Sequence, residues 1–114
     1  DSAEKVAAEA RSLGVGAIVA MGNVGDSASV KEIAGKALTE FGAVDIVVNN
    51  AAIRPHKPFL EMDEEFWHNV ISIDMHSAFY TGQAFVPGMV DRGWGRVINI
   101  TGMNAMHGYN GRCP

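Results

Sequence analysis

The sequence predicts an α/β fold in which helices alternate with the strands of a doubly wound parallel sheet. Amphipathic stretches with helical spacing alternate with short, wholly apolar stretches, and the order is helix, strand, helix, strand, helix, strand. Apolar runs without polar alternation are typical of strands that helices cover on both faces. Helical crossovers of the usual right-handed kind then make consecutive strands parallel.

Composition limits the size and class of the protein. At 114 residues the chain has the length of one domain, and 47% hydrophobic with 19% charged residues is a globular balance. We therefore expect a single domain over residues 1–114. The net charge of -4 comes without a Lys/Arg cluster, which argues against a nucleic-acid partner.

Two further absences bear on location. No apolar run reaches the roughly 18 residues that a membrane span needs, so we expect no membrane association. The single cysteine, Cys113, excludes an intrachain disulfide and suits the reducing cytoplasm. The chain opens without Met inside a helical pattern and stops at Pro114 after a Gly/Asn-rich loop, so both ends resemble cut ends.

The first helix and strand occupy the first 21 residues. Asp1 with Glu4 resembles a capping box, and apolar residues recur at helical spacing until Gly14 ends the helix. Residues 17–21 are a continuous apolar run after Gly16, which predicts a buried strand.

The second helix is the clearest periodic element. Asp26-Ser27 offers a cap, and residues 28–41 carry apolar side chains at i, i+3, i+4 and i+7 up to Gly42. Residues 45–48 then form a second apolar strand, which ends abruptly in the polar pair Asn49-Asn50.

A long helix and a third strand complete the pattern. Residues 54–58 form a proline-rich loop, and the carboxylates of residues 63–65 suit a helix N-terminus. The helix is predicted over residues 64–90, bent or interrupted near Pro87 because proline removes a backbone donor. The third strand covers residues 97–101, and a loop follows it.

Small and polar residues follow each predicted strand. The three strand ends are Gly22-Asn23-Val24, Asn49-Asn50-Ala51-Ala52 and Thr101-Gly102-Met103-Asn104. Ligands of open parallel sheets bind outside the carboxyl ends of the strands, and small residues let a flat cofactor approach the backbone. From the residues alone, we expect a nucleotide-like ligand in an α/β crevice.

At these residues the chain resembles the short-chain dehydrogenase/reductases, over nearly its whole length. Asn49-Asn50-Ala51-Ala52 resembles the Asn-Asn-Ala-Gly motif, and Asn23-Val24 resembles the Asp-Val motif after the third strand of that family. Phe66-Trp67 through Phe79 resembles its Trp-led helix, and residues 95–102 resemble its Gly-x-Ile/Val-Asn-Ile-Ser-Ser strand. The motifs occur in the family's order and spacing.

The resemblance implies an incomplete Rossmann-like doubly wound parallel sheet. The first two strands and the C-terminal part would be missing, and the family's sheet order is 3-2-1-4-5. The strands at 17–21 and 45–48 would then not be neighbours. Unpaired edges and incompletely covered helices would invite association, so we expect that the 114-residue polypeptide does not fold alone as a stable monomer.

The resemblance also implies the cofactor, NAD or NADP. Asn23 and Val24 would flank its adenine ring, although Asn23 replaces the family's Asp. The residues Asn49, Asn50, Ala51 and Ala52 would line the adenosine side and tie the central strands together, and Ile100 would belong to the same wall. The alternative for Asn49 and Asn50 is a strand-ending turn. The glycine-rich phosphate loop and the residue that separates NAD from NADP would precede Asp1, so the preference is not readable.

The family's chemistry needs a Tyr activated by a Lys, a Ser that orients the substrate, and an Asn that holds a proton-relay water. By resemblance, the Asn position falls on Asp74, which could still bind water or could be only a buried or capped polar residue. The Ser position falls on Gly102, which has no hydroxyl. Thr101 has one, but strand alternation directs it to the opposite face unless the strand bulges.

The Tyr is expected just past Pro114. Tyr109 is a poor substitute, because Cys113 and not Lys stands four residues later. The histidines His56, His76 and His107 lack metal-ligand spacing, so we expect no metal site.

The resemblance implies an NAD(P)-dependent oxidoreductase that reduces a carbonyl or oxidises an alcohol of a small molecule, as a 3-oxoacyl reductase does. This piece alone is expected to be inactive, and the full-length protein is expected to be a homo-oligomer through the helix that begins near Glu64. The alternative is a catalytically silent protein of the same fold that binds nucleotide or acts as a scaffold. A flavodoxin-like or receiver domain is a third possibility, but Asp45 opens its strand instead of ending it.

Overall fold

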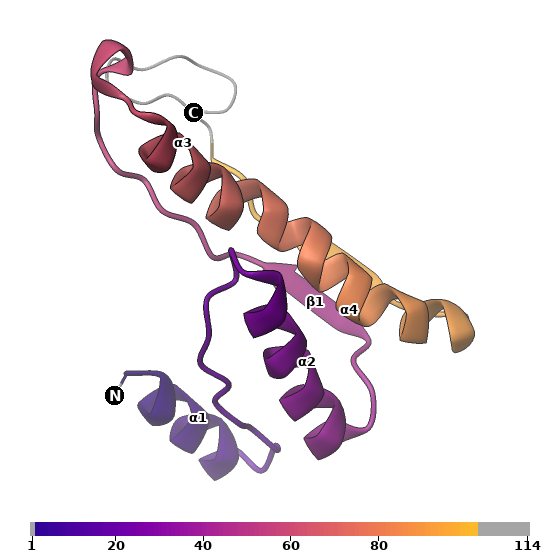
Figure 1. Ribbon diagram of the computed structural model, residues 1–114. Coiled ribbons are helices and arrows are strands. Elements are labelled where there is room, and N and C mark those ends of the chain that lie inside the picture. The colour runs from indigo at the N-terminus through magenta and orange to yellow at the C-terminus, as the bar shows by residue number, and fades with distance from the viewer. Residues whose placement is uncertain (1, 103–114) are drawn as a thin grey trace.

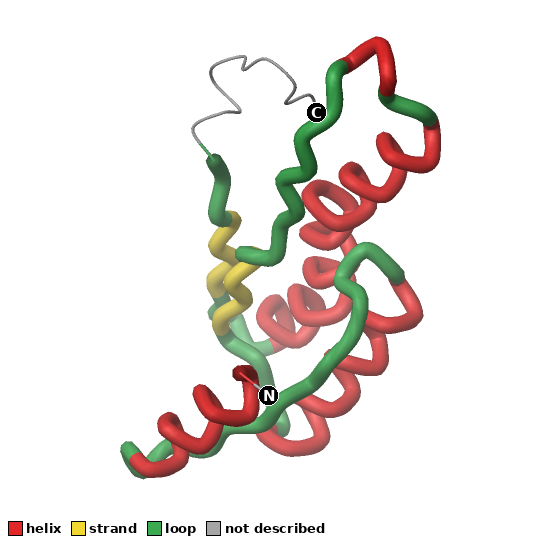
Figure 2. Tube along the Cα trace, turned by 90° about the vertical axis from the view of Figure 1, so that its left-hand side faces the viewer, coloured by secondary structure: helices red, strands yellow, loops and turns green. Residues whose placement is uncertain are grey.

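A computed structural model describes residues 2–102, which form helices packed on a small parallel sheet. The strands are β1 (Ile46–Asn49) and β2 (Arg96–Asn99), and they pair in parallel from Ile46 with Arg96 to Asn49 with Asn99. Helices α2 and α4 lie together on one side of the sheet (Figures 1 and 2). The predicted parallel α/β arrangement is therefore confirmed, with β1 and β2 starting and ending close to their expected positions.

The first two helices follow their sequence signals. Helix α1 covers Ser2–Ser12, and helix α2 covers Ser27–Phe41. The carboxylate of Asp26 caps α2 by accepting a hydrogen bond from the Ser29 N–H, at 2.7 Å. Gly42 ends the helix with φ of 73°, and its N–H donates to the Leu38 carbonyl at 2.9 Å.

The long helix between the strands has an interruption that was expected elsewhere. After the 3₁₀ turn η1 (Phe59–Glu61), the structure shows α3 (Glu64–Ile71), a π-helical turn η2 (Ser72–His76) and α4 (Ser77–Asp91). The helix was predicted to be bent or interrupted near Pro87, and an interruption there is wrong, since α4 continues through Pro87. Pro87 and Gln83 both lie on the exposed face, where water can bond to the carbonyl that proline leaves without a donor.

The strand predicted at residues 17–21 is absent from the described part of the chain, where the sheet contains only β1 and β2. The segment is not helical, and residues 17–20 are half-buried. A strand is defined by hydrogen bonds to a neighbouring strand, and the described residues provide no such neighbour for this segment. The apolar pattern therefore marks a segment that should belong to a sheet but has no partner here.

The core lies between α2, β1 and α4. Its buried members are Ala34, Val47, Phe85 and Met89, and Val44 packs beside them. Arg92, at the end of α4, donates to the Val44 carbonyl at 2.8 Å and to Asp45 at 2.9 Å, so the start of β1 is fastened to the helix. The core is thus held at the amino-terminal end of the sheet.

Much apolar surface remains uncovered. All four residues of β2 are exposed, and Val97 and Ile98 keep 41% and 45% of their surface in contact with solvent. The radius of gyration is 16.4 Å, larger than the about 13 Å of a compact domain of this length. Both features are those of an incompletely covered sheet.

We expect the isolated 114-residue polypeptide to lack a cooperative thermal transition that is independent of concentration, because its sheet edges and apolar faces are open. Calorimetry at several protein concentrations, together with sedimentation, would measure this. A single sharp transition at an unchanged temperature across concentrations, with a monomeric mass, would contradict the expectation.

Candidate functional site

The carboxyl ends of β1 and β2 are joined by a pair of asparagine side chains. The Nδ2 of Asn49 donates to the Oδ1 of Asn99 at 2.8 Å, and the Ile100 N–H donates to the Asn49 carbonyl at 2.9 Å. These bonds continue the strand pairing into the side chains at the edge of the sheet. They bring the segment after Asn49 beside the segment after Asn99.

Helix α4 contacts the same asparagine. The Oγ1 of Thr81 lies 2.8 Å from the Oδ1 of Asn49 and 3.0 Å from the Ser77 carbonyl, so its single proton can be shared between the two acceptors. Asn49 is half-buried, and both ends of its amide are engaged by protein groups. This arrangement suits tying strands and helix together more than contacting a ligand.

The residues that follow Asn49 are open to solvent. Asn50, Ala51 and Ala52 are exposed, and the alanines present no side chain beyond Cβ. A flat ligand could therefore reach the backbone of this segment. It forms one side of the candidate site.

The turn at residues 22–25 approaches the π-helical turn. The Oδ1 of Asn23 accepts from the Gly25 N–H at 2.9 Å, while the Asn23 N–H donates to the Ser29 hydroxyl at 2.8 Å. A Cβ atom placed on Gly25 would lie 2.9 Å from the Ser72 Oγ and 3.2 Å from its carbonyl carbon. A Cβ here would therefore require Ser72 or Ile73 to shift, and glycine avoids that cost. Val24, which lies between Asn23 and Gly25, is half-buried.

Asp74 connects the π-helical turn to the segment after β1. Its Oδ1 accepts a hydrogen bond from the Ile53 N–H at 2.9 Å, and the residue is otherwise exposed. A π-helical turn inserts an extra residue into the helix and often occurs at functional sites. Here it carries the carboxylate to the backbone beyond Ala52, with one oxygen left for another donor such as water.

The segment after β2 faces an arginine that the sequence did not single out. Ile100 is 54% exposed, Thr101 is exposed, and Gly102 is half-buried. A Cβ atom placed on Gly102 would lie 3.6 Å from the Nη2 of Arg54. The guanidinium group therefore borders the side-chain position of Gly102.

The loop between Arg54 and α3 is fastened by one lysine. The Lys57 ammonium donates to Asp63 at 2.7 Å and lies 5.0 Å from the centre of the Phe66 ring. The hydrogen bonds that Asp63 accepts from Lys57 and from the Phe66 N–H hold the pKa of its carboxyl group below the usual value. Asp63 thus caps α3 as a carboxylate.

The structure brings most of the expected site residues to one edge of the sheet. The residues after β1, the residues after β2 and Asp74 lie there together, and the turn at Asn23 meets them through the π-helical turn. Tyr109, His107 and Cys113 lie outside the described residues. Within residues 2–102 no group of His, Cys, Asp or Glu is arranged to hold a metal ion, and no helix is long and apolar enough to cross a bilayer.

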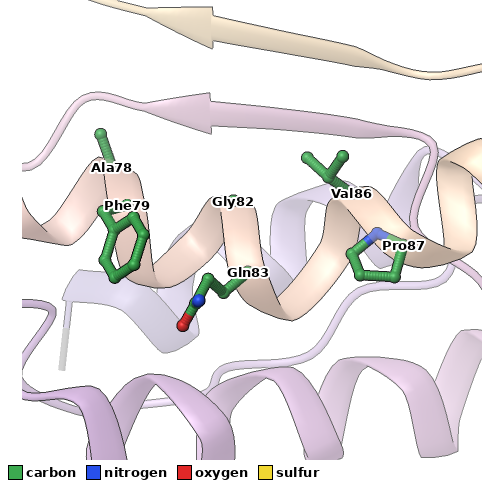
Figure 3. A pocket seen from close by; sticks show the side chains of 6 residues that line it. All are labelled: Ala78, Phe79, Gly82, Gln83, Val86 and Pro87. Atoms are coloured by element: carbon green, nitrogen blue, oxygen red, sulfur yellow. The ribbon is translucent and has the colours of Figure 1, made fainter.

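A separate groove runs along α4. It has a volume of about 420 Å³ and is lined by Ala78, Phe79, Gly82, Gln83, Val86 and Pro87 (Figure 3). These residues belong to one helix, and none of them is titratable. The groove therefore offers apolar contact and one amide, and it does not contribute to the candidate site.

The comparisons with known proteins decide the family. The family model described as short chain dehydrogenase matches residues 1–114. The chain belongs to the short-chain dehydrogenase family.

Relatives within the short-chain dehydrogenase family match most of this chain. Nodulation protein G of Azospirillum brasilense is 42% identical over 88% of this chain and 41% of its own length. Acetoacetyl-CoA reductase of Cupriavidus necator is 37% identical over 96% of this chain and 44% of its own length. The 3-oxoacyl-(acyl-carrier-protein) reductase FabG of Staphylococcus epidermidis is 32% identical over 98% of this chain and 46% of its own length. The chain spans less than half the length of these relatives.

We expect Gly25→Ala to lower the free energy of unfolding of the complete protein by about 1–3 kcal/mol, because the added methyl group would press against Ser72. Gly35→Ala in α2 is the matched control, since its Cβ would meet nothing within 4 Å and should stabilise the helix by about 0.5–1 kcal/mol. Chemical denaturation measures both changes. Equal effects of the two substitutions would show that the close approach at Gly25 does not exist.

We also expect Asp74→Ala to raise the hydrogen-exchange rate of the Ile53 amide by about tenfold or more, because it removes a charged acceptor. Asp74→Asn should leave most of the protection, since its amide oxygen can still accept. Exchange measured by NMR or mass spectrometry on the complete protein tests this. An Ile53 amide that exchanges equally fast in all three proteins would rule out the bond.

Proposed function

We propose that this chain is the central part of a nicotinamide-dependent oxidoreductase that reduces a carbonyl group or oxidises an alcohol of a small molecule. The proposal rests on one observation in a member of the short-chain dehydrogenase family: the ends of β1 and β2 and the carboxylate of Asp74 meet at one edge of a parallel sheet. Ligands of such sheets bind at that edge.

NAD or NADP fits the exposed residues of this edge. Ala51 and Ala52 leave the backbone open, and the side-chain amide nitrogen of Asn23 makes no hydrogen bond with the described residues, so it remains a donor for an adenine ring. When bound, the nicotinamide would supply or accept the hydride. Asn50, Val24 and Ile100 would complete the wall around the adenosine.

The protein's own residues would then position the substrate and its protons. Asp74 is held by the Ile53 N–H through one oxygen, so its other oxygen could retain a water for proton relay. Gly102 cannot donate a hydrogen bond from a side chain, and Thr101 is an exposed hydroxyl beside it. A Tyr-x-x-x-Lys sequence directly after Pro114 would supply the general acid and the lysine that lowers its pKa.

A 3-oxoacyl thioester is the substrate class that we propose. Two of the relatives are named acetoacetyl-CoA reductase and 3-oxoacyl-(acyl-carrier-protein) reductase. We further propose a single domain over residues 1–114, a cytoplasmic homo-oligomer, and no nucleic-acid or membrane partner, on the basis of the single cysteine, the unclustered charge and the uncovered apolar faces.

A catalytically silent relative is the second candidate. It is favoured by Gly102 at the serine position and by Asp74 at the asparagine position. Such a protein would keep the nucleotide-binding edge and lose turnover.

We expect the complete protein to oxidise NADH or NADPH when acetoacetyl-CoA is added, because the strand edge would place a thioester ketone beside the nicotinamide. The measurement is the loss of the reduced cofactor's absorbance, and Asp74→Ala should slow it by about 10²-fold or more if the carboxylate holds the relay water. Binding of cofactor without turnover of acetoacetyl-CoA or acetoacetate would favour the second candidate, a catalytically silent protein. Absence of cofactor binding would contradict both candidates.

A further inference from the structure

Arg54 and Gly102 come from different strand ends and meet at the candidate site. Arg54 follows the exposed segment after β1, and Gly102 follows β2. A Cβ atom on Gly102 would lie 3.6 Å from the Nη2 and 3.8 Å from the Cζ of Arg54, which is ordinary van der Waals contact. Among the described residues, the guanidinium group is thus the side chain nearest to a Cβ placed on Gly102.

The charge of Arg54 is not used inside the described protein. Arg54 is exposed, and within residues 2–102 it makes no ion pair and no hydrogen bond, whereas Arg11, Lys57 and Arg92 each pair with a carboxylate. Residues 103–114 contain no Asp or Glu that could pair with it. Its five N–H donors therefore remain available to a ligand.

The backbone that precedes Arg54 is held next to Asp74. The preceding residue, Ile53, donates its N–H to the Asp74 carboxylate at 2.9 Å, and Lys57 fastens the other side of the loop to Asp63. The backbone beside Arg54 is thereby held next to the Asp74 carboxylate, and its guanidinium group reaches the end of β2. A substrate oxygen bound at this edge would come within reach of the guanidinium group.

Reduction of a ketone needs a hydrogen-bond donor at this oxygen. As a hydride reaches the carbonyl carbon, the C=O π bond breaks and negative charge develops on the oxygen, and donors aimed at that charge lower the barrier. Gly102 supplies none. We propose that the Arg54 guanidinium donates the hydrogen bond to the substrate oxygen that a hydroxyl side chain at position 102 would otherwise donate.

This inference rests on the proposed carbonyl reduction and adds to it the residue that compensates for Gly102. The guanidinium acts only as a hydrogen-bond donor, since arginine does not give up a proton in proteins. A bound reduced nicotinamide would supply the hydride, and the family's tyrosine hydroxyl would supply the proton that completes the alcohol and would regain one from water. Arg54 is therefore a catalytic residue that stabilises charge without transferring a proton.

The test uses the complete protein with acetoacetyl-CoA and with neutral ethyl acetoacetate. We expect Arg54→Ala to lower kcat for both substrates by about 10²–10³-fold with little change in KM, as loss of one such donor does in other enzymes. Lys36→Ala, which removes an exposed cation of α2, is the matched control and should leave kcat unchanged. Cofactor binding measured by fluorescence should be equal in all variants.

The decisive variant combines Arg54→Ala with Gly102→Ser. The space at Gly102 accepts a Cβ, so the new hydroxyl should raise kcat at least about tenfold above that of Arg54→Ala. If Arg54 had only a structural role, a hydroxyl at position 102 would not restore kcat. Unchanged kcat in Arg54→Ala, a loss confined to the KM of the charged thioester, or no recovery in the double variant would each overturn the inference. Absence of turnover by the unsubstituted protein would instead overturn the proposed function on which the inference rests.

Discussion

The hydrogen bond between the side chains of Asn49 and Asn99 is the contact on which the candidate site depends. It fixes the two strands at the point where both leave the sheet, and Thr81 joins α4 to the same amide. A slip of one residue would turn every side chain of a strand to the opposite face. Because this pair holds the register, the segments after β1 and β2 leave the sheet side by side.

The π-helical turn is the second element that shapes this edge. It places Asp74 under the Ile53 N–H and presents Ser72 to the backbone at Gly25. A regular helix over the same residues would rotate one set of side chains away from the other. One extra residue in the turn thus lets a single helix contact both the segment after β1 and the turn before α2.

The open surfaces of the molecule lie where strand pairing is absent from the described residues. Residues 17–21 have no strand neighbour there, and β1 pairs on one edge only. The core at Val47, Phe85 and Met89 is nonetheless formed, because α2 and α4 cover one face of β1. Packing on that face does not need the rest of the sheet.

The sequence by itself determined the local features of this protein. Asp26 and Gly42 bound α2 through contacts within a few residues, and the apolar runs predicted β1 and β2 to within one or two residues. The resemblance placed Asp74 and Gly102 at family positions. Pro87 misled the prediction because its effect on a helix depends on whether the freed carbonyl faces water, which is a property of packing.

Only the tertiary structure decided which of these residues meet. Asn49 and Asn99 are separated by a whole crossover, as are Arg54 and Gly102, and no spacing rule predicts a contact between their side chains. Because both strands end in Asn, parallel pairing in this register could have suggested the contact between Asn49 and Asn99. The second depends on the path of a loop, and loops are set by long-range contacts such as Ile53 with Asp74 and not by a repeating pattern.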